Sequence, residues 1–258
     1  MLSRTLLHIY GPFCIYSYGF IIAIGAIATF YLIKRNHKRL AIISDELLLN
    51  VFSLTILSGV IGGRLLYLLG NYNDISSWFD ICAVHKGGLS ILGSIITVLL
   101  VLSWYLKQNK IPVLPFLDLL AIYAPLLQSF SRLGCLFAGC CFGKPAILPW
   151  AIIYKTQDTL APTFCSLHPT QLYSALGLFL IFIFLHYIAQ YRLKKPGLLM
   201  FAYLTLVSLN RFVVDFYRGD QEFFETNTLL SIHQWIALSI TIGSLIGFII
   251  ISRKNNNT

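Results

Sequence analysis

Long apolar runs alternate along the chain with short charged or turn-forming pieces. A helix needs about 20 apolar residues to cross the hydrocarbon core of a bilayer. Seven segments approach this length, and each is predicted to form a membrane-spanning helix: residues 17–33, 47–69, 88–106, 113–135, 171–189, 197–213 and 236–252. The end of the fourth segment is the hardest to place, because Gly134, Gly139 and Gly143 could break the helix there.

The positive charges are concentrated in alternate loops. Eleven of the 19 lysines and arginines lie in the pieces KRNHKR (34–39), KQNKIP (107–112), QYRLKKPG (190–197) and SRKNNNT (252–258). Loops rich in lysine and arginine stay on the cytoplasmic side of a membrane. We therefore predict that the N-terminus lies outside and the C-terminus in the cytoplasm.

Composition narrows the class of protein further. The 258 residues are 57% hydrophobic and only 11% charged, with a mean hydropathy of +0.75, which excludes an ordinary soluble domain. We expect an all-α, polytopic integral membrane protein with a single domain over 1–258 and no cleavable signal peptide at MLSRTLLHIYGPF. The net charge of +9 is explained by membrane orientation, so the expected partner is the lipid bilayer and not nucleic acid.

Two arginines stand inside predicted spans, where a guanidinium costs roughly 2.5–3.5 kcal/mol. Arg132 lies in YAPLLQSFSRLGCLFAGCCFG, and Arg211 lies in LMFAYLTLVSLNRFVVDFYRGD. Such residues persist beside a partner, a water-filled cavity or an anionic ligand. Arg132 and Arg211 therefore indicate an internal site for something negative. For Arg64 and Arg218, which lie near span ends, snorkelling to the interface is an equal alternative.

Four short patterns carry most of the polar chemistry. KGGLSILGS (86–94) opens the third span, SRLGCLFAGCCFGK (131–144) closes the fourth, and HPTQLY (168–173) opens the fifth. In NRFVVDFYR (210–218), Arg211, Asp215 and Arg218 follow at i, i+4 and i+7. On a continuous helix these three would share a face, so that Asp215 neutralises and orients the arginines.

These patterns resemble, in order, the landmarks of the bacterial prolipoprotein diacylglyceryl transferases, from about residue 10 to residue 250. Besides the four patterns, GPFCIYSYG, GGRLLYLL (62–69) and His233–Gln234–Trp235 resemble conserved stretches of that family. The resemblance implies transfer of diacylglycerol from phosphatidylglycerol to the lipobox cysteine of lipoprotein precursors, at the signal peptide, in the bacterial cytoplasmic (inner) membrane. It implies no cofactor and no metal.

The resemblance also assigns roles to residues. It implies catalytic roles for Arg132, Arg211 and Asp215, with His85, His168 or Asp215 as the proton acceptor. It implies substrate contacts at thirteen positions: Tyr18, Arg64, Gly87, Gly88, Ser90, Gly134, Cys135, Cys140, His168, Gln171, Tyr173, Arg218 and Gln234.

Three positions depart from the family pattern. Cys135 stands where the family has Asn, Cys140 where it has Glu, and Leu92 where it has His. The cysteines have four interpretations: small-residue packing, a Cys140–Cys165 disulfide, a zinc site with His168, or a thiol nucleophile. Accordingly two other functions stay open, a divergent enzyme with other acceptor chemistry and a non-enzymatic lipid-binding or transport protein.

Overall fold

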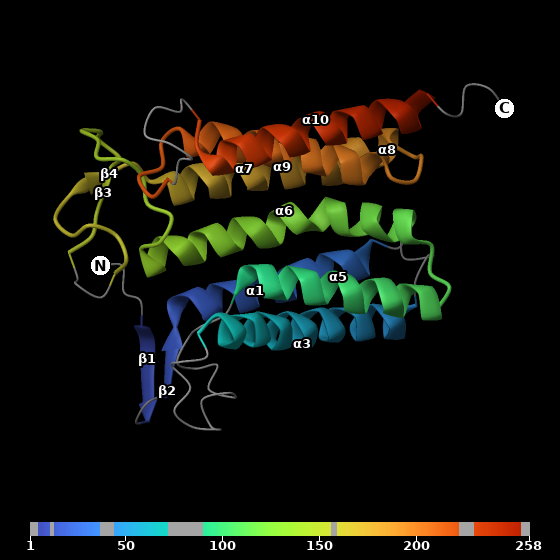
Figure 1. Cartoon of the computed structure of the whole chain (residues 1–258), viewed down its shortest axis with the longest axis horizontal. Helices are drawn as coiled ribbons and strands as arrows, with labels where there is room; N and C mark the ends of the chain where they lie inside the picture. The colour runs from blue at the N-terminus through green and yellow to red at the C-terminus, as the bar shows by residue number, and fades with distance from the viewer. Residues whose placement is uncertain are drawn as a thin grey trace. The chain divides into compact units, whose positions relative to one another are not determined.

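The computed structural model describes residues 5–10, 13–36, 44–71, 90–155, 159–221 and 230–253. Each of the seven apolar segments coincides with a helix or a continuous helical run. The helices are α1 (Ser17–Arg35), α3 (Asp45–Gly70), α5 (Ile91–Gln108), α6 (Val113–Ala138), α7 (Thr170–Phe184) with its continuation η3 (Leu185–Ala189) and α8 (Gln190–Arg192), α9 (Leu198–Asp215) and α10 (Ile232–Arg253) (Figure 1).

Six of these helical runs are long and apolar enough to cross a membrane, and α5 supplies a shorter apolar helix over Leu92–Gln108. The protein is therefore an all-α, multi-pass membrane protein. The third helix begins at Ile91, later than the predicted residue 88. The fourth runs past Gly134 to Ala138 and ends at Gly139, whose φ of +72° suits a residue without a side chain.

Short strands accompany the helices. β1 (Thr5–Tyr10) and β2 (Phe13–Tyr16) form an antiparallel hairpin before α1. β3 (Ile152–Ile153) and β4 (Ser166–Leu167) pair in the connection between α6 and α7. The strands are too short to alter the fold class.

The chain packs as two compact units. One unit comprises residues 34–116, with α3 and α5, and the other comprises residues 1–33 and 117–258. In the first unit α3 and α5 approach closely: a Cβ added at Gly93 would lie 2.3 Å from the Gly62 carbonyl oxygen. Small residues allow such approach between membrane helices. That the two units act as one domain stays a prediction.

In the second unit α7, α9 and α10 run side by side (Figure 1). Hydroxyl pairs join α9 to α10 at 2.8 Å: Ser208 with Thr241, and Thr205 with Ser244. Interhelical hydrogen bonds of this kind help membrane helices to associate.

The start of α9 is held by a carboxylate from α6. Asp118 is 1% exposed and accepts hydrogen bonds from the backbone N–H groups of Gly197 (2.7 Å) and Met200 (2.8 Å). These N–H groups have no partner within the helix, and a negative charge there complements the helix dipole. Asp118 therefore fixes α9 relative to α6, and with it the arginine that α9 carries at its other end.

Candidate functional site

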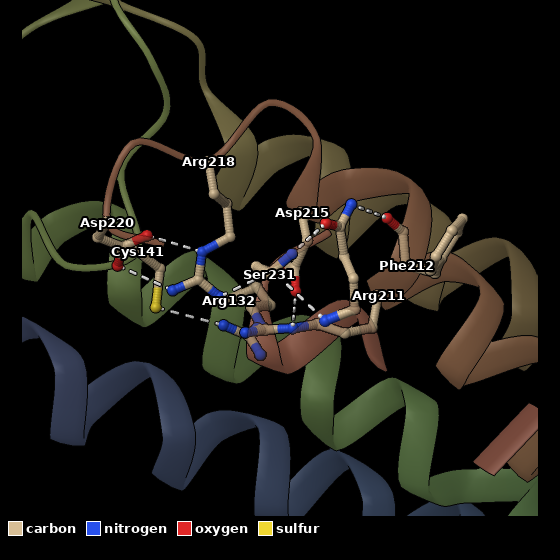
Figure 2. A network of polar contacts seen from close by, with 9 residues as sticks. Arg132, Cys141, Arg211, Phe212, Asp215, Arg218, Asp220 and Ser231 are labelled. Carbon is tan, nitrogen blue, oxygen red and sulfur yellow. Dashed lines mark hydrogen bonds and ion pairs between the residues drawn. The ribbon is translucent and has the colours of Figure 1, made fainter. Parts of the chain in front are cut away.

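Three arginines gather where α6 and α9 end (Figure 2). The Nε of Arg211 donates to Asp215 Oδ2 at 2.9 Å, and a terminal nitrogen of Arg218 lies 3.6 Å from Asp215 Oδ1. The Asp215 side chain is fully buried. The guanidinium of Arg132, from α6, lies close enough to Arg211 for the two charges to interact. The predicted pairing of Asp215 with both neighbouring arginines is confirmed.

Arg218 does not lie on the helix, contrary to the expected i+7 relation. α9 ends at Asp215, and Arg218 follows a turn and enters a β-bridge with Gly143. Its guanidinium forms two 2.8 Å hydrogen bonds with the carboxylate of Asp220. Although burial opposes the charge, these contacts raise the pKa of Arg218. Arg218 is therefore a permanently charged residue that is already neutralised by its own loop.

Backbone hydrogen bonds tie the segment after α6 to the segment after α9. Lys144 N–H donates to the Tyr217 carbonyl at 2.8 Å, and Gly219 N–H donates to Phe142 at 3.0 Å. The residue before α7 joins them, since His168 N–H donates to the Lys144 carbonyl at 3.0 Å. A Cβ at Gly143 would meet the His168 carbonyl oxygen at 2.4 Å, so only glycine fits this junction.

Three thiols form a cluster beside the arginines. The Sγ atoms of Cys135, Cys140 and Cys141 all lie within 4.8 Å of one another. Buried side chains from the start of α7 hold the backbone of this cluster: Gln171 Nε2 donates to the Cys140 carbonyl at 2.8 Å, and Thr170 Oγ1 donates to the Cys141 carbonyl at 2.7 Å. Cys141 has a φ of +58°, a conformation that non-glycine residues rarely adopt.

Arg132 joins the thiol cluster to the arginines. Its terminal nitrogen donates to Cys141 Sγ at 3.4 Å (Figure 2). Hydrogen bonds from the thiols of Cys135 and Cys140 lower the pKa of Cys141, and the charges of Arg218 and Arg132 lower it further. Hydrogen bonding with Cys135 and Cys141 raises the pKa of Cys140 instead. The thiol of Cys141 is therefore easier to ionise than that of Cys140.

Two of the interpretations of the cysteines can be compared with this geometry. The Cys140–Cys165 disulfide is not formed: both residues are free thiols, and Cys165 packs in a small core with Tyr154, Ala161 and Leu167. His168 does not belong to the cluster of thiols, so the structure does not support a zinc site that includes this histidine.

His168 and Tyr173 lie instead in an aromatic pocket of about 560 Å³. Tyr173 Oη accepts a hydrogen bond from Trp150 Nε1 at 2.9 Å and lies 3.3 Å from His168 Nδ1. The His168 ring also packs against Tyr217, with 5.3 Å between ring centroids. The pocket is completed by residues of the same connection and of α9, namely Leu148, Asn210, Val213 and Val214.

A second, smaller cavity of about 230 Å³ lies between α9 and α10. Its walls are almost entirely apolar, although Arg211 and His233 are among the residues that line it. The cavity therefore combines an apolar groove with a guanidinium.

The remaining predicted residues have varied surroundings. Tyr18 hydrogen-bonds Ser131, and its ring lies so close to Gly134 that a Cβ there would be 2.9 Å away. Gln234 caps α10: its N–H donates to Ser231 Oγ and its Oε1 accepts from Ser231 N–H at 2.9 Å. These contacts support structural roles for Gly134 and Gln234.

Two predicted residues that the structure describes belong to the unit of residues 34–116. Arg64 is buried, with its guanidinium 5.4 Å from the Tyr67 ring centroid. Ser90 is the N-cap of α5, accepting from Gly93 N–H at 3.4 Å. His85, Gly87 and Gly88 lie outside the described residues, so their predicted roles stay predictions.

Sequence reasoning missed several residues of the site. Cys141 was considered only among the cysteines and not as a site residue, and Thr170 gave no signal beyond adjacency to Gln171. Asp220 could have been found, since it stands two residues after Arg218 in a turn-forming GD pair. Tyr217 could not, because its packing on His168 depends on how the loops fold back.

Comparison with known proteins shows the family of the chain. The family model for prolipoprotein diacylglyceryl transferase matches residues 4–250. A phosphatidylglycerol–prolipoprotein diacylglyceryl transferase of Clostridium tetani is 34% identical over 230 residues, or 89% of this chain and 90% of the relative. A second, from Clostridium perfringens, is 35% identical over 234 residues, or 90% and 89% of the two chains. Another from Thermotoga maritima is 31% identical and covers 85% and 76%. The chain therefore belongs to the prolipoprotein diacylglyceryl transferase family.

Proposed function

We propose that this protein transfers a diacylglyceryl group from phosphatidylglycerol to the lipobox cysteine of lipoprotein precursors. One observation carries the proposal beyond family membership: Arg132 and Arg211, from two different membrane helices, come together at the same end of those helices. Arg211 shares the carboxylate of Asp215 with Arg218, so Asp215 balances only part of the positive charge, and an anionic lipid head group would balance more of it.

The phosphate of the donor lipid fits Arg132 and Arg211 better than Arg218. Arg218 is occupied on both sides by Asp215 and Asp220. Among the described residues, Arg211 uses only its Nε in a hydrogen bond, so its terminal amino groups are left for a phosphate. Arginine binds phosphate oxygens with two parallel N–H groups, and these contacts strengthen as negative charge develops on the leaving group.

The reaction then requires one bond to form and one to break. The acceptor thiol loses its proton, the thiolate forms a C–S bond with a glycerol carbon of the lipid, and the C–O bond to glycerol phosphate breaks. Arg132 and Arg211 hold the departing phosphate, while Asp215 orients Arg211. The other predicted site residues would contribute to donor or acceptor binding, with the aromatic pocket of His168 and Tyr173 beside the acceptor peptide.

The apolar groove and the basic loops indicate how the site is oriented in the membrane. The apolar groove between α9 and α10 suits an acyl chain whose head group meets Arg211. The arginine site lies at the end of α9 and α6 opposite to the basic pieces 190–197 and 107–112. With those pieces in the cytoplasm, the site faces the outer leaflet of the bacterial cytoplasmic membrane.

The test is transfer by purified protein. The protein in detergent micelles is mixed with phosphatidylglycerol and a lipobox peptide, and the peptide mass is followed. We expect the peptide to gain a diacylglyceryl group, and a peptide with Ser at the acceptor position to remain unchanged. Arg211→Ala should lower the rate at least 10²-fold, whereas Arg192→Ala, at the other end of the helices, should not.

The alternative of a lipid-binding protein without activity gives a different result. Such a protein would bind phosphatidylglycerol in an Arg211-dependent way and leave the peptide unmodified. Unmodified peptide with a well-folded, lipid-binding protein would refute the proposed function.

A further inference from the structure

We propose that Cys135, Cys140 and Cys141 bind a zinc ion, and that this ion activates the thiol of the acceptor cysteine. The proposal rests on the proposed function and accounts for one step of it, the deprotonation of the acceptor thiol. Leu92, which stands where the resemblance implies a histidine, has no group that could accept that proton.

The geometry of the three thiols suits one metal ion. In a tetrahedral site with Zn–S bonds of about 2.3 Å, sulfur atoms are about 3.8 Å apart. The three Sγ atoms lie within 4.8 Å of one another, so small rotations of the side chains suffice. Cys135 belongs to α6, while Cys140 and Cys141 follow the turn at Gly139 that brings the chain back over the helix end.

The surroundings preorganise this cluster. The carbonyls of Cys140 and Cys141 are held by Gln171 and Thr170, which are 2% and 1% exposed. These bonds keep Cys141 in its disfavoured left-handed conformation, and backbone strain of this kind concentrates at functional sites.

The local charge suits a zinc–thiolate complex. Zinc with three thiolates carries a net charge of about −1. Arg132, which donates to Cys141 Sγ at 3.4 Å, brings a positive charge that balances it. Hydrogen bonds to liganding atoms also fix the orientation of metal ligands.

A coordination position is left for the acceptor. Among the described residues, no histidine, carboxylate or further cysteine joins the three thiols as a fourth ligand. Catalytic zinc sites have three protein ligands and one open position, and a thiol that coordinates zinc is deprotonated. The acceptor thiol would bind there and release its proton to water. Its sulfur would then attack the glycerol carbon while glycerol phosphate leaves onto Arg132 and Arg211, and the neutral thioether would dissociate from zinc.

A covalent lipid intermediate on Cys141 explains the thiol cluster less well than a zinc site does. Attack by Cys141 on the lipid would give a thioether, and passing the lipid to the acceptor would require breaking that C–S bond with a thiolate as leaving group. An ether-like sulfur bond to carbon is far more inert than the acyl and phosphoryl linkages that enzymes use as intermediates.

Metal content tests the site independently of activity. Full-length protein purified in detergent without chelators should contain about one zinc per chain. Cys135→Ser, Cys140→Ser and Cys141→Ser should each lower the zinc content more than tenfold, while the matched control Cys165→Ser should not. Equal zinc in all four variants, no zinc in the wild type, or a disulfide within the cluster in freshly isolated protein would each overturn the proposal.

Cobalt(II) substitution tests the open position, and it does so in the wild-type chain even if a cysteine variant does not fold. The cobalt protein should show thiolate-to-metal charge-transfer absorption that increases when lipobox peptide is added. The peptide with Ser in place of the acceptor Cys should give no increase. An unchanged spectrum with the Cys peptide would refute activation of the acceptor by the metal.

Transfer assays separate this inference from the proposed function. Removal of zinc should lower transfer at least 10²-fold, and zinc should restore it. Full transfer by metal-free protein would refute the inference and leave the function standing. Absence of transfer by the zinc-loaded protein would refute the function and leave the metal site standing.

Discussion

Replacement of Asp215 by Asn tests whether Arg211 owes its position to this carboxylate. Asparagine keeps the size of the side chain and one hydrogen-bond acceptor but removes the charge. Asp215 is fully buried, 2.9 Å from Arg211 Nε and 3.6 Å from Arg218. The change therefore removes the negative charge shared by two arginines without creating a cavity.

The magnitude follows from these contacts. Removing one partner of a fully buried ion pair costs about 3–5 kcal/mol. The cost here is smaller, because Arg218 keeps its two bonds to Asp220 and the Arg211 side chain is 26% exposed. We expect a loss of about 2 kcal/mol in stability, which corresponds to about 30-fold in the unfolding equilibrium. Transfer should fall further, by about 10²-fold, because a catalytic group displaced by about 1 Å loses that much rate.

The assay compares Asp215→Asn with Asp220→Asn in the same detergent. The control also removes one negative charge, but from Arg218 alone and at a side chain that is 28% exposed. Thermal unfolding followed by circular dichroism gives the stability, and the peptide mass assay gives the rate. Asp220→Asn should lower transfer less than tenfold. Equal losses in the two variants, or an Asp215→Asn protein with at least half the wild-type rate, would refute the reasoning.

Three further changes test other parts of the molecule. Arg132→Lys should lower transfer more than tenfold, because lysine lacks the planar fork that grips phosphate; wild-type rates would contradict phosphate binding at Arg132. Gly143→Ala should lower the Tm by about 3–10 °C, since its Cβ would meet the His168 carbonyl at 2.4 Å, whereas Gly243→Ala meets nothing within 4 Å and should not. A cysteine placed at position 37 should react with an impermeant thiol reagent only from the cytoplasmic side, and labelling from outside would overturn the predicted topology.

Much of the fold could be predicted because the length of an apolar run has a direct physical meaning in a membrane. The exceptions are at helix ends. The sequence allows a break of the helix at Gly134. In the structure the helix continues, and Gly134 faces the ring of Tyr18, where a small residue permits close packing of α1 on α6. Gly139 does end the helix, through a positive φ. The sequence shows the same residue type at both positions, and only tertiary contacts distinguish packing from termination.

The site could be predicted where its partners are close in sequence. Arg211 and Asp215 are four residues apart on one helix, and their ion pair follows from helix geometry. Arg132 and Cys141 are nine residues apart and meet only because the chain reverses after Gly139. Spacing contains no information about that reversal, so the sequence does not predict which cysteine Arg132 contacts.

The charges of the site suggest why the thiols and the phospholipid must be considered together. Arg211 and Arg218 contact the carboxylates of Asp215 and Asp220, and Arg132 donates to the sulfur of Cys141. A phosphate that enters this site has to take over one of these contacts. The contact of Arg132 with the sulfur of Cys141 is the easiest to give up, because sulfur is a weaker hydrogen-bond acceptor than a carboxylate oxygen. Zinc with three thiolates would still carry a net charge of about −1, so the ion would keep Arg132 beside the cluster until the phosphate arrives.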